Sequence, residues 1–439
     1  MTVTVKKFKG GVHPDDGKAL SCAESIQVAP LLDKYYVILH QHIGAPPKLL
    51  VANGDEVKKG QMIAESGGFV SASVHAPTSG TVKLIDWPGP AGVNASAVEI
   101  TADGKDEWDP SVNHDPNWEK LSIDEIKKRI SAAGIVGMGG AAFPTSVKLS
   151  PPPDKKIDTL ILNGAECEPY LTADHRLMLE ESEKILKGAQ LLGKVLNVEN
   201  VYIGIEKNKP DAIESLIAFA DKYNVKVVPL RVRYPQGAEK QLIYACTGRE
   251  VPSGKLPMDV ACVVQNVGTA VAVVDAVTDR IPLIERITTV TGSTVCNPGN
   301  WKFRIGTPLN KVLEFAGGVK KQPAKILFGG PMMGISQTSL DVPIMKNTSG
   351  VLLLDEKEIA QYSSHPCIRC GRCVTACPML LMPGTLSLMI ESENFDMAEY
   401  TNVMDCIECG SCAYVCPALR PMVQHMRRGK AEVIANKQK

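Results

Sequence analysis

Two cysteine-rich segments near the end of the chain have a spacing that could hold inorganic clusters. The first reads CIRCGRCVTACP over residues 367–378, and the second reads CIECGSCAYVCP over residues 406–417. Each follows the pattern C-x2-C-x2-C-x3-C-P, in which three cysteines bind one [4Fe–4S] cluster and the fourth binds the other. We therefore predict one cluster on Cys367, Cys370, Cys373 and Cys416, and a second cluster on Cys406, Cys409, Cys412 and Cys377.

Two other uses of these cysteines fit less well. Structural zinc usually takes two C-x2-C pairs separated by a longer loop, whereas here four cysteines fall within eleven residues, twice. A disulfide framework is typical of secreted proteins, and the first residues, MTVTVKK, lack the apolar stretch of a secretory signal. Of 13 cysteines, eight lie in the two segments and the rest are scattered, which favours a reducing compartment.

Composition excludes some classes of partner. The 439 residues include 48 basic and 48 acidic side chains, so no net field is expected to attract nucleic acid. The most apolar long stretch, residues 260–277, is interrupted by Gln265, Asn266, Thr269 and Asp275, so we expect no membrane span. Any membrane association is therefore expected through a partner. The length predicts about two to four domains.

The first 120 residues predict a small β domain followed by a polar linker. Strands are expected over residues 35–40, 48–51, 57–64 and 75–85, separated by turns such as Asn53-Gly54-Asp55. The pattern resembles the barrel-sandwich hybrid domain of lipoyl and biotinyl carriers. Carriers place a modifiable lysine on the hairpin tip, but residues 67–73 here read GGFVSAS. We therefore expect a docking domain without a swinging arm.

The middle of the chain alternates strands with helices, which predicts a largely parallel sheet. Ser122 and Glu125 form a capping box that should open a helix continuing through Ile130. Strands are expected at 159–163, 200–205 and 225–230, helices at about 174–192 and 211–223, and another helix is expected to open at 261–269. Short β segments over 286–354 with one helix at 309–315 indicate a β-grasp-like module. Between the cysteine segments, 28 residues predict two short helices at 385–392 and 396–402, so the cluster region should be helical.

Four loops at predicted strand ends could bind a phosphate-bearing cofactor. They read GMGGAAFPT from Gly137, NGAECEP from Asn163, YPQGAE from Tyr234 and QNVGT from Gln265. Glycines let main-chain N–H groups approach a phosphate, and loops at the carboxyl ends of parallel strands converge on ligands. Carboxylates at Glu166 and Glu168 suit ribose hydroxyls or the polar atoms of a flavin.

These four loops resemble the FMN- and NADH-binding loops of the flavoprotein subunit of complex I. With GGVHP at Gly10 and the two cysteine segments, the order of parts resembles the C subunits of Rnf complexes over nearly the whole chain. That resemblance implies a peripheral subunit on the cytoplasmic face of the membrane, within an ion-pumping ferredoxin:NAD+ oxidoreductase. It also implies contact with other subunits of the complex, including an iron–sulfur subunit, and only an indirect contact with ferredoxin.

The resemblance also implies site residues. FMN would lie against Gly137, Gly139, Gly140 and Lys148, with Asn163, Glu166, Tyr234, Gly237, Glu239, Asn266 and Thr269 around it. NAD(H) would stack near Phe143 and approach Glu168. Two positions depart from the complex I flavoprotein: Met138 replaces an arginine and Ala165 replaces an acidic residue, which leaves the nucleotide contacts less defined than those of the flavin.

We therefore expect a multi-domain α/β and α+β protein in four parts. These are a barrel-sandwich hybrid with linker (1–120), an FMN- and NADH-binding α/β domain (121–285), a soluble-ligand-binding β-grasp domain (286–355) and a two-[4Fe–4S] ferredoxin-type domain (356–439). Nicotinamide exchanges electron pairs and clusters exchange single electrons, so a flavin is the natural converter. Two alternatives remain open: a wiring subunit without NADH activity, and a cobalamin reductase with flavin and clusters. A basic C-terminal helix with Arg420, Arg427, Arg428 and Lys430 is also expected.

Overall fold

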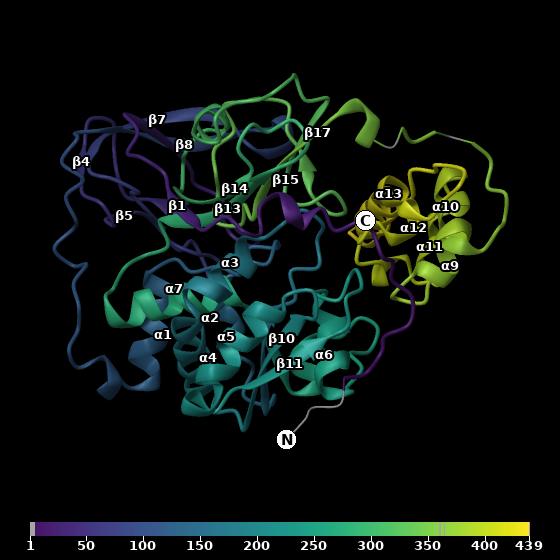
Figure 1. Cartoon of the computed structure of the whole chain (residues 1–439), viewed down its shortest axis with the longest axis horizontal. Coiled ribbons are helices and arrows are strands. Elements are labelled where there is room, and N and C mark those ends of the chain that lie inside the picture. Colours follow the sequence, from purple (N-terminus) through teal and green to yellow (C-terminus); the bar gives the residue numbers. More distant parts are fainter. Residues whose placement is uncertain (1–4, 360, 364, 439) are drawn as a thin grey trace.

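The computed structural model describes residues 5–359, 361–363 and 365–438. The N-terminal β domain, which carries the labels β4, β5, β7 and β8 in Figure 1, contains two small sheets. One sheet has the order β2 (Lys34–Ile38), β8 (Asn94–Ala102), β7 (Gly80–Pro88) and β4 (Glu56–Val57). The other contains β3 (Lys48–Leu49), β5 (Met62–Glu65) and β6 (Val74–His75). This confirms the predicted β domain, although β8 was not predicted. Residues 103–120, expected as a linker, contain only the short 3-10 helix Trp118–Lys120.

The central domain is built on a four-stranded sheet that is parallel, as predicted, although only three of its strands were expected. Its order is β11 (Lys226–Leu230), β10 (Asn200–Glu206), β9 (Thr159–Gly164) and β12 (Cys262–Asn266). One face packs against α1 (Ile123–Ala132), α4 (Ser182–Leu196), α5 (Pro210–Ala220) and α7 (Val267–Thr278), and the other packs against α6 (Glu239–Thr247). The inner strand β9 and the edge strand β12 are therefore both buried on their two faces, which explains their continuous apolar sequence.

The prediction of a single helix over 174–192 is wrong. The structure has α3 (Ala173–Glu180) and α4, and the chain bends at Glu181, where φ is −129°. The Ser182 hydroxyl bonds the carbonyl of Met178 at 2.5 Å and meets the hydroxyl of Ser215 at 2.6 Å. Serine hydroxyls that bond nearby carbonyls offer the backbone an alternative to a continuous helix, and apolar periodicity does not reveal such a break.

The β-grasp region forms a six-stranded sheet. Its order is β1 (Ile26–Val28), β14 (Gly299–Arg304), β13 (Glu285–Thr291), β17 (Gly350–Leu354), β15 (Lys325–Phe328) and β16 (Ile335–Ser336). Helix α8 (Leu309–Phe315) packs on it through Leu309, Val312 and Leu313. Strand β1 comes from the first 120 residues and pairs in parallel with β14. The β-grasp sheet therefore includes a strand from the start of the chain.

The cysteine-rich region is helical, as predicted. It contains α9 (Arg372–Ala376), α10 (Pro383–Glu391), α11 (Phe395–Tyr400), α12 (Ser411–Tyr414) and α13 (Met422–Lys437), and the part described from 365 to 438 has no strand. Arg420 was expected on the basic helix, but it precedes α13 and is buried. Its guanidinium bonds the hydroxyl of Ser387 at 3.0 Å and pairs with Glu391. A buried guanidinium needs such partners for its charge and its N–H groups. Arg420 therefore lies inside the domain and not on the exposed face of α13.

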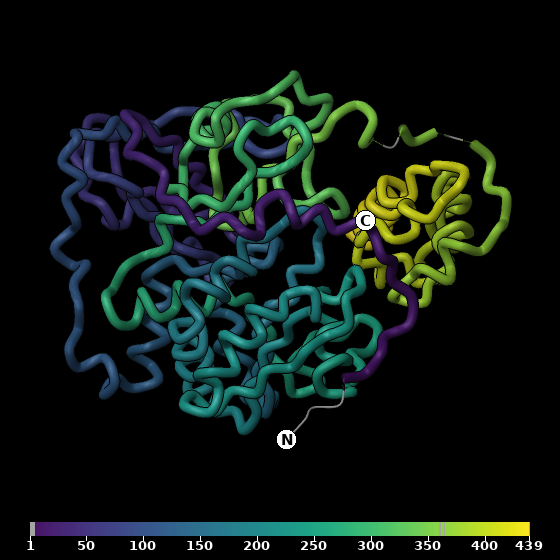
Figure 2. Tube along the Cα trace, viewed as in Figure 1, coloured from purple at the N-terminus to yellow at the C-terminus, as the bar shows by residue number. Residues whose placement is uncertain are grey.

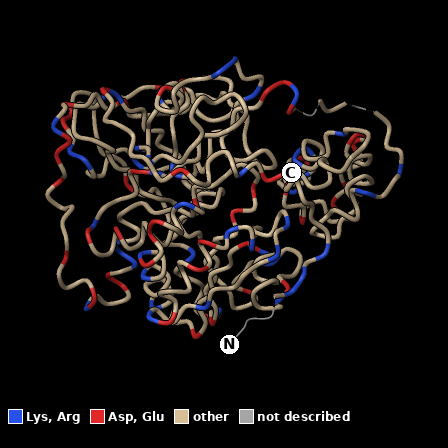
Figure 3. The backbone as a smooth tube through the Cα atoms, viewed as in Figure 1, with Lys and Arg blue, Asp and Glu red and all other residues tan. Residues whose placement is uncertain are grey.

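The N-terminal segment crosses from the central domain to the helical region, as the purple tube in Figure 2 shows. Val12 forms an isolated bridge with Tyr234, and the Gly11 amide donates to the Ala376 carbonyl at 2.8 Å. Lysine and arginine (blue) are interspersed with aspartate and glutamate (red) over the trace in Figure 3, which fits the balanced composition. Among the described helices, none combines the length and hydrophobicity needed to cross a bilayer.

Candidate flavin and iron–sulfur site

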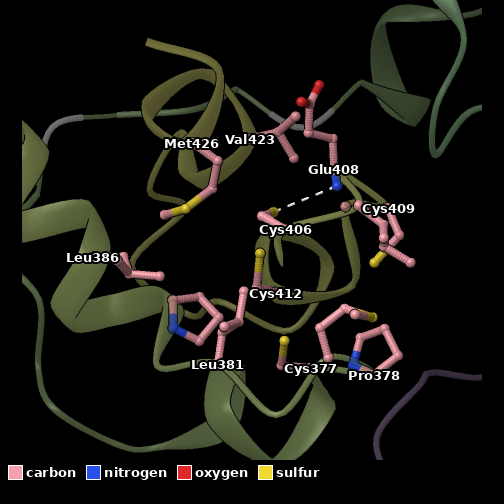
Figure 4. Close-up of a pocket in the computed structure, with 14 residues that line it drawn as sticks. Cys377, Pro378, Leu381, Leu386, Cys406, Glu408, Cys409, Cys412, Val423 and Met426 are labelled. Carbon is pink, nitrogen blue, oxygen red and sulfur yellow. Dashed lines mark hydrogen bonds between the residues drawn. The ribbon is translucent and has the colours of Figure 1, made fainter. Parts of the chain in front are cut away.

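The cysteines form two groups in space. Cys377, Cys406, Cys409 and Cys412 line one hollow, together with Leu381, Leu386 and Met426 (Figure 4). Their sulfur atoms surround this hollow and do not meet at a point: among the described residues, no three His, Cys, Asp or Glu side chains are placed to hold a single metal ion. We name these four residues the proximal cysteine set.

The remaining four cysteines form the distal cysteine set. A Cβ added to Gly384 would lie 3.3 Å from the sulfur of Cys373 and 3.7 Å from that of Cys367. Burial raises the pKa of Cys373, and the neighbouring Cys367 and Cys416 thiols act in the same direction. Cys370 is exposed. Cys377 thus lies with the first three cysteines of the second segment, and Cys416 lies with Cys367 and Cys373 of the first, which supports the predicted ligand sets.

The proximal cysteine set faces the central domain. The Tyr234 hydroxyl donates to the Cys409 carbonyl at 2.7 Å, and the side-chain amide of Gln241 donates to the Pro378 carbonyl at 3.2 Å. Tyr234 is only 3% exposed. The distal set lies under an exposed loop in which Ile368 is 65% exposed. One set is therefore docked on the parallel-sheet domain, and the other faces solvent.

The glycine loop is fixed to the start of α7. The Met138 amide donates to the Thr269 hydroxyl at 3.0 Å, and the Gly137 amide donates to the Phe143 carbonyl at 2.8 Å. The Arg286 guanidinium donates to the Met138 carbonyl at 2.9 Å from the other side. Thr269 is fully buried and Phe143 is half-buried. Thr269, predicted as a flavin contact, therefore contributes to the site by holding the glycine loop in position.

The other predicted residues come together at the carboxyl ends of the strands. Asn163 donates to the Gly237 carbonyl at 2.8 Å, and Lys148 pairs with Glu239 at 2.9 Å while donating to the Val264 carbonyl at 3.1 Å. Asn266 lies beside the glycine loop, with its Cβ 3.7 Å from a Cβ added to Gly139. A Cβ added to Gly140, at φ +122°, would meet nothing within 4 Å. The four loops thus converge on one region.

Two predicted carboxylates have partners within the protein. Glu166 accepts from the amides of Asp174 at 2.7 Å and His175 at 3.3 Å, so it caps the start of α3. Glu168 accepts from the amides of Met332 and Met333 in the β-grasp domain. Burial raises the pKa of each carboxyl to about 7. Neither carboxylate points freely into the region where the loops meet.

Several buried polar atoms on the same loops have no partner among the described residues. They are the Thr145 hydroxyl, the Gln236 amide nitrogen and both amide atoms of Gln265. Each unpaired buried polar group costs the folded protein about 1–3 kcal/mol of stability. A polar ligand such as FMN that made hydrogen bonds to these atoms would therefore bind more tightly. These residues fit a flavin, and the predictions did not include them, although all three lie inside or beside the quoted loops.

Buried cations near the site also escaped prediction. Lys18 donates to the carbonyls of Leu171 at 2.5 Å and Glu168 at 3.0 Å, and Lys209 donates to the Ala165 carbonyl at 2.7 Å. Both lysines are buried, with exposures of 7% and 1%. They fix the loop that carries Glu166 and Glu168. No local pattern distinguishes them from surface lysines.

Four family models match successive parts of the chain. They are the RnfC barrel sandwich hybrid domain over residues 6–105, the Nuo51 FMN-binding domain over 130–275, the SLBB domain over 287–336 and the 4Fe-4S dicluster domain over 360–417. The predicted fold class and the predicted FMN and iron–sulfur cofactors are therefore confirmed.

Curated relatives match over nearly the whole chain. The C subunit of the proton-translocating ferredoxin:NAD(+) oxidoreductase complex of Clostridium ljungdahlii is 53% identical over 98% of this chain and 94% of that protein. The C subunit of the Na(+)-translocating complex of Acetobacterium woodii is 45% identical over the full length of both. The C subunit of the ion-translocating oxidoreductase complex of Pseudomonas aeruginosa is 45% identical, and 56% of that longer protein is covered.

Among solved structures, an NAD+-reducing [NiFe]-hydrogenase in the H2-reduced state shares the fold. The TM-score is 0.52 at 18% identity, covering 72% of this chain and 64% of that chain. With the curated relatives, the family is established on the full sequence. The chain belongs to the family of C subunits of ion-translocating ferredoxin:NAD(+) oxidoreductase complexes.

Proposed function

We propose that this chain is the peripheral subunit that passes electrons between NAD(H) and two [4Fe–4S] clusters by way of FMN, within an ion-pumping ferredoxin:NAD+ oxidoreductase. The observation that carries the proposal is the docking of the proximal cysteine set on the loops of the parallel sheet, through Tyr234 and Cys409. When bound, FMN exchanges electron pairs with nicotinamide and single electrons with clusters. Reduction of one NAD+ consumes two electrons and one proton.

The residues of the chain hold and separate the redox groups. The glycine loop and Asn163, Lys148, Gly237 and Asn266 would hold the flavin at the carboxyl ends of the strands, with Phe143 beside the nicotinamide. The proximal set would then exchange electrons with the flavin, and the distal set with a partner. The order flavin, proximal set, distal set follows from the docking contacts alone.

The exposed distal loop suggests where a partner protein docks on the chain. Cys370 is exposed, and Ile368, Arg369 and Arg372 around it are exposed as well. We infer that an iron–sulfur subunit of the membrane complex meets this loop on the cytoplasmic face, and that ferredoxin contacts the chain only through that subunit. An exposed cluster loop shortens the distance to an electron donor outside the chain.

The test is anaerobic purification followed by titration with NADH. About eight irons and one FMN per chain are expected, and NADH should bleach the flavin and reduce the clusters. Gly139→Val should abolish bleaching, because a Cβ at Gly139 meets Asn266 only at 3.7 Å and the added methyls would project into the ligand region. Gly68→Ala, with its nearest neighbour at 3.5 Å, is the control. A wild-type chain that binds flavin but is not bleached would refute the proposal.

A second candidate is a wiring subunit without its own NADH activity. Met138, at the position of the arginine in the related flavoprotein, is 4% exposed, and its sulfur lies 3.5 Å from the Arg286 guanidinium. The glycine loop thus presents no cation of its own to a nucleotide. If the chain is such a wiring subunit, Gly139→Val would leave electron transfer between the clusters and an artificial acceptor unchanged. NADH would then reduce neither the wild-type chain nor Gly139→Val.

A further inference from the structure

Glu168 joins the flavin-site loop to the β-grasp domain. Its carboxylate accepts from the Met332 amide at 3.1 Å and from the Met333 amide at 2.9 Å. Both amides belong to the turn of residues 329–334, between β15 and β16, which we name the β-grasp turn. The turn approaches so closely that a Cβ added to Gly330 would lie 2.3 Å from Oε2 of Glu168. Only glycine fits at that position while the carboxylate stays in place.

The opposite side of the β-grasp turn touches the proximal cysteine set. A Cβ added to Gly410, which lies between Cys409 and Cys412, would be 3.0 Å from the Met332 carbonyl oxygen. The Met332 side chain packs in an apolar cluster that includes Tyr234 and Cys409. The turn is therefore a layer between the flavin-site loop and the loop that would bind the proximal cluster.

The bonding of Glu168 suits a charged carboxylate that positions a backbone. Two main-chain donors on one carboxylate are charge-assisted and stronger than neutral hydrogen bonds. Lys18 holds the Glu168 carbonyl at 3.0 Å, so the residue is fixed at its main chain as well as at its side chain. Burial raises the pKa of the carboxyl to about 7, so the hold on the turn should weaken as the pH falls below neutral.

We propose that Glu168 is a positioning residue for the proximal cluster: it holds the β-grasp turn against the Cys409–Cys412 loop, and the turn excludes water from that cluster. Exposure to solvent and nearby dipoles set the potential of an iron–sulfur cluster. The turn supplies both a cover and the Met332 carbonyl dipole. The contacts described for the turn reach Gly410 and Cys409 of the proximal loop, so the proximal cluster should be affected more than the distal one. The electrochemical part of the proposal rests on the proposed function, whereas the structural part does not.

The first measurement needs no cofactor. In the purified full chain, amide hydrogen exchange at Met332 and Met333 should become about tenfold faster in Glu168→Gln, because the neutral amide offers one acceptor to two donors. Gly330→Ala should act in the same way from the other side of the contact, since its Cβ displaces the unchanged carboxylate. Glu214→Gln, an exposed carboxylate on α5, and Gly68→Ala are the matched controls. Unchanged exchange in both test variants would overturn the proposal.

The second measurement separates the two clusters. In a redox titration followed by electron paramagnetic resonance, Glu168→Gln and Gly330→Ala should each shift the midpoint potential of one cluster and leave the other in place. Lowering the pH from 8 to 6 should move the wild-type potential toward that of Glu168→Gln. Equal shifts in the potentials of both clusters would overturn the proposal. A raised KM for NADH with unchanged potentials would also overturn it, because that result would show that Glu168 contacts the nucleotide. A wild-type chain without clusters would refute the proposed function and leave the exchange result standing.

Discussion

Substituting Gly10 should loosen the N-terminal segment from the helical cluster domain. Gly10 has φ +74°, and a Cβ there would lie 2.3 Å from the carbonyl oxygen of Cys377 and 2.8 Å from the nitrogen of Pro378. Both atoms are backbone, so neither can move as a flexible side chain would. Alanine therefore adds left-handed strain and a steric clash at the same position.

The two penalties can be separated with a matched glycine. Left-handed backbone costs a residue with a Cβ about 1–2 kcal/mol, and forcing extra atoms into a packed site costs about 1–3 kcal/mol more. Gly104 has φ +77°, and a Cβ there meets nothing within 4 Å. Gly104→Ala thus carries the strain without the clash. The difference between the variants, about 1–3 kcal/mol, is the part that acts on the cluster domain.

Hydrogen exchange at the Gly11 amide reports this difference directly. That amide donates to the Ala376 carbonyl at 2.8 Å, so it is protected only while the segment lies on the cluster domain. The clash alone, at about 1–3 kcal/mol, corresponds to exchange roughly 5- to 150-fold faster in Gly10→Ala than in wild type, and relief of the left-handed strain adds to this increase. Gly104→Ala should leave this amide unchanged. Equal exchange at Gly11 in the two variants would refute the proposed contact between segment and domain.

Three further predictions follow from the same geometry. Cys377→Ser should lower the iron count from about eight to about four per chain. Adding Cys412→Ser should remove no more iron, because both cysteines belong to the proximal set. A further loss of iron in the double variant would contradict the crossed ligand sets. Tyr234→Phe leaves the Cys409 carbonyl without its donor at 2.7 Å. This should weaken the docking of the cysteine-rich domain by about 1–3 kcal/mol and speed its proteolysis. Burial raises the pKa of the Glu166 carboxyl from its ordinary 4.5 to about 7. The folded state therefore binds the carboxyl proton more tightly than the unfolded state does, and the free energy of unfolding should fall as the pH rises from 4.5 to 7. Glu166→Gln should flatten that decline.

Features controlled by near neighbours in the sequence were predicted well. The helix expected at 309–315 matches α8, and the Ser122–Glu125 capping box is present at the start of α1. The cysteine spacing is local in the same sense, because one turn of backbone determines where three sulfur atoms lie. The loops converge as expected because the ends of parallel strands share one edge of a sheet.

Features that depend on distant partners were not predictable. Lys346 is 1% exposed, and its ammonium donates to the carbonyls of Ser73 at 2.6 Å and Gly134 at 2.7 Å, each more than 200 positions away. Lysine ordinarily predicts a solvated surface. The loop around Glu168 suggests a nucleotide contact, whereas the partners of its carboxylate lie 164 and 165 positions further along the chain.

The pairing of β1 with β14 affects how the chain is made on the ribosome. Ile26 emerges early, but its partner Asn300 is translated roughly 270 residues later, which at ordinary elongation rates is roughly 15–55 seconds. Throughout that interval the first strand has free main-chain donors and acceptors, and the sheet it completes does not yet exist. Exposed strand edges invite aggregation. Nascent chains of this protein should therefore depend on chaperones at their amino ends until synthesis has passed the β-grasp region.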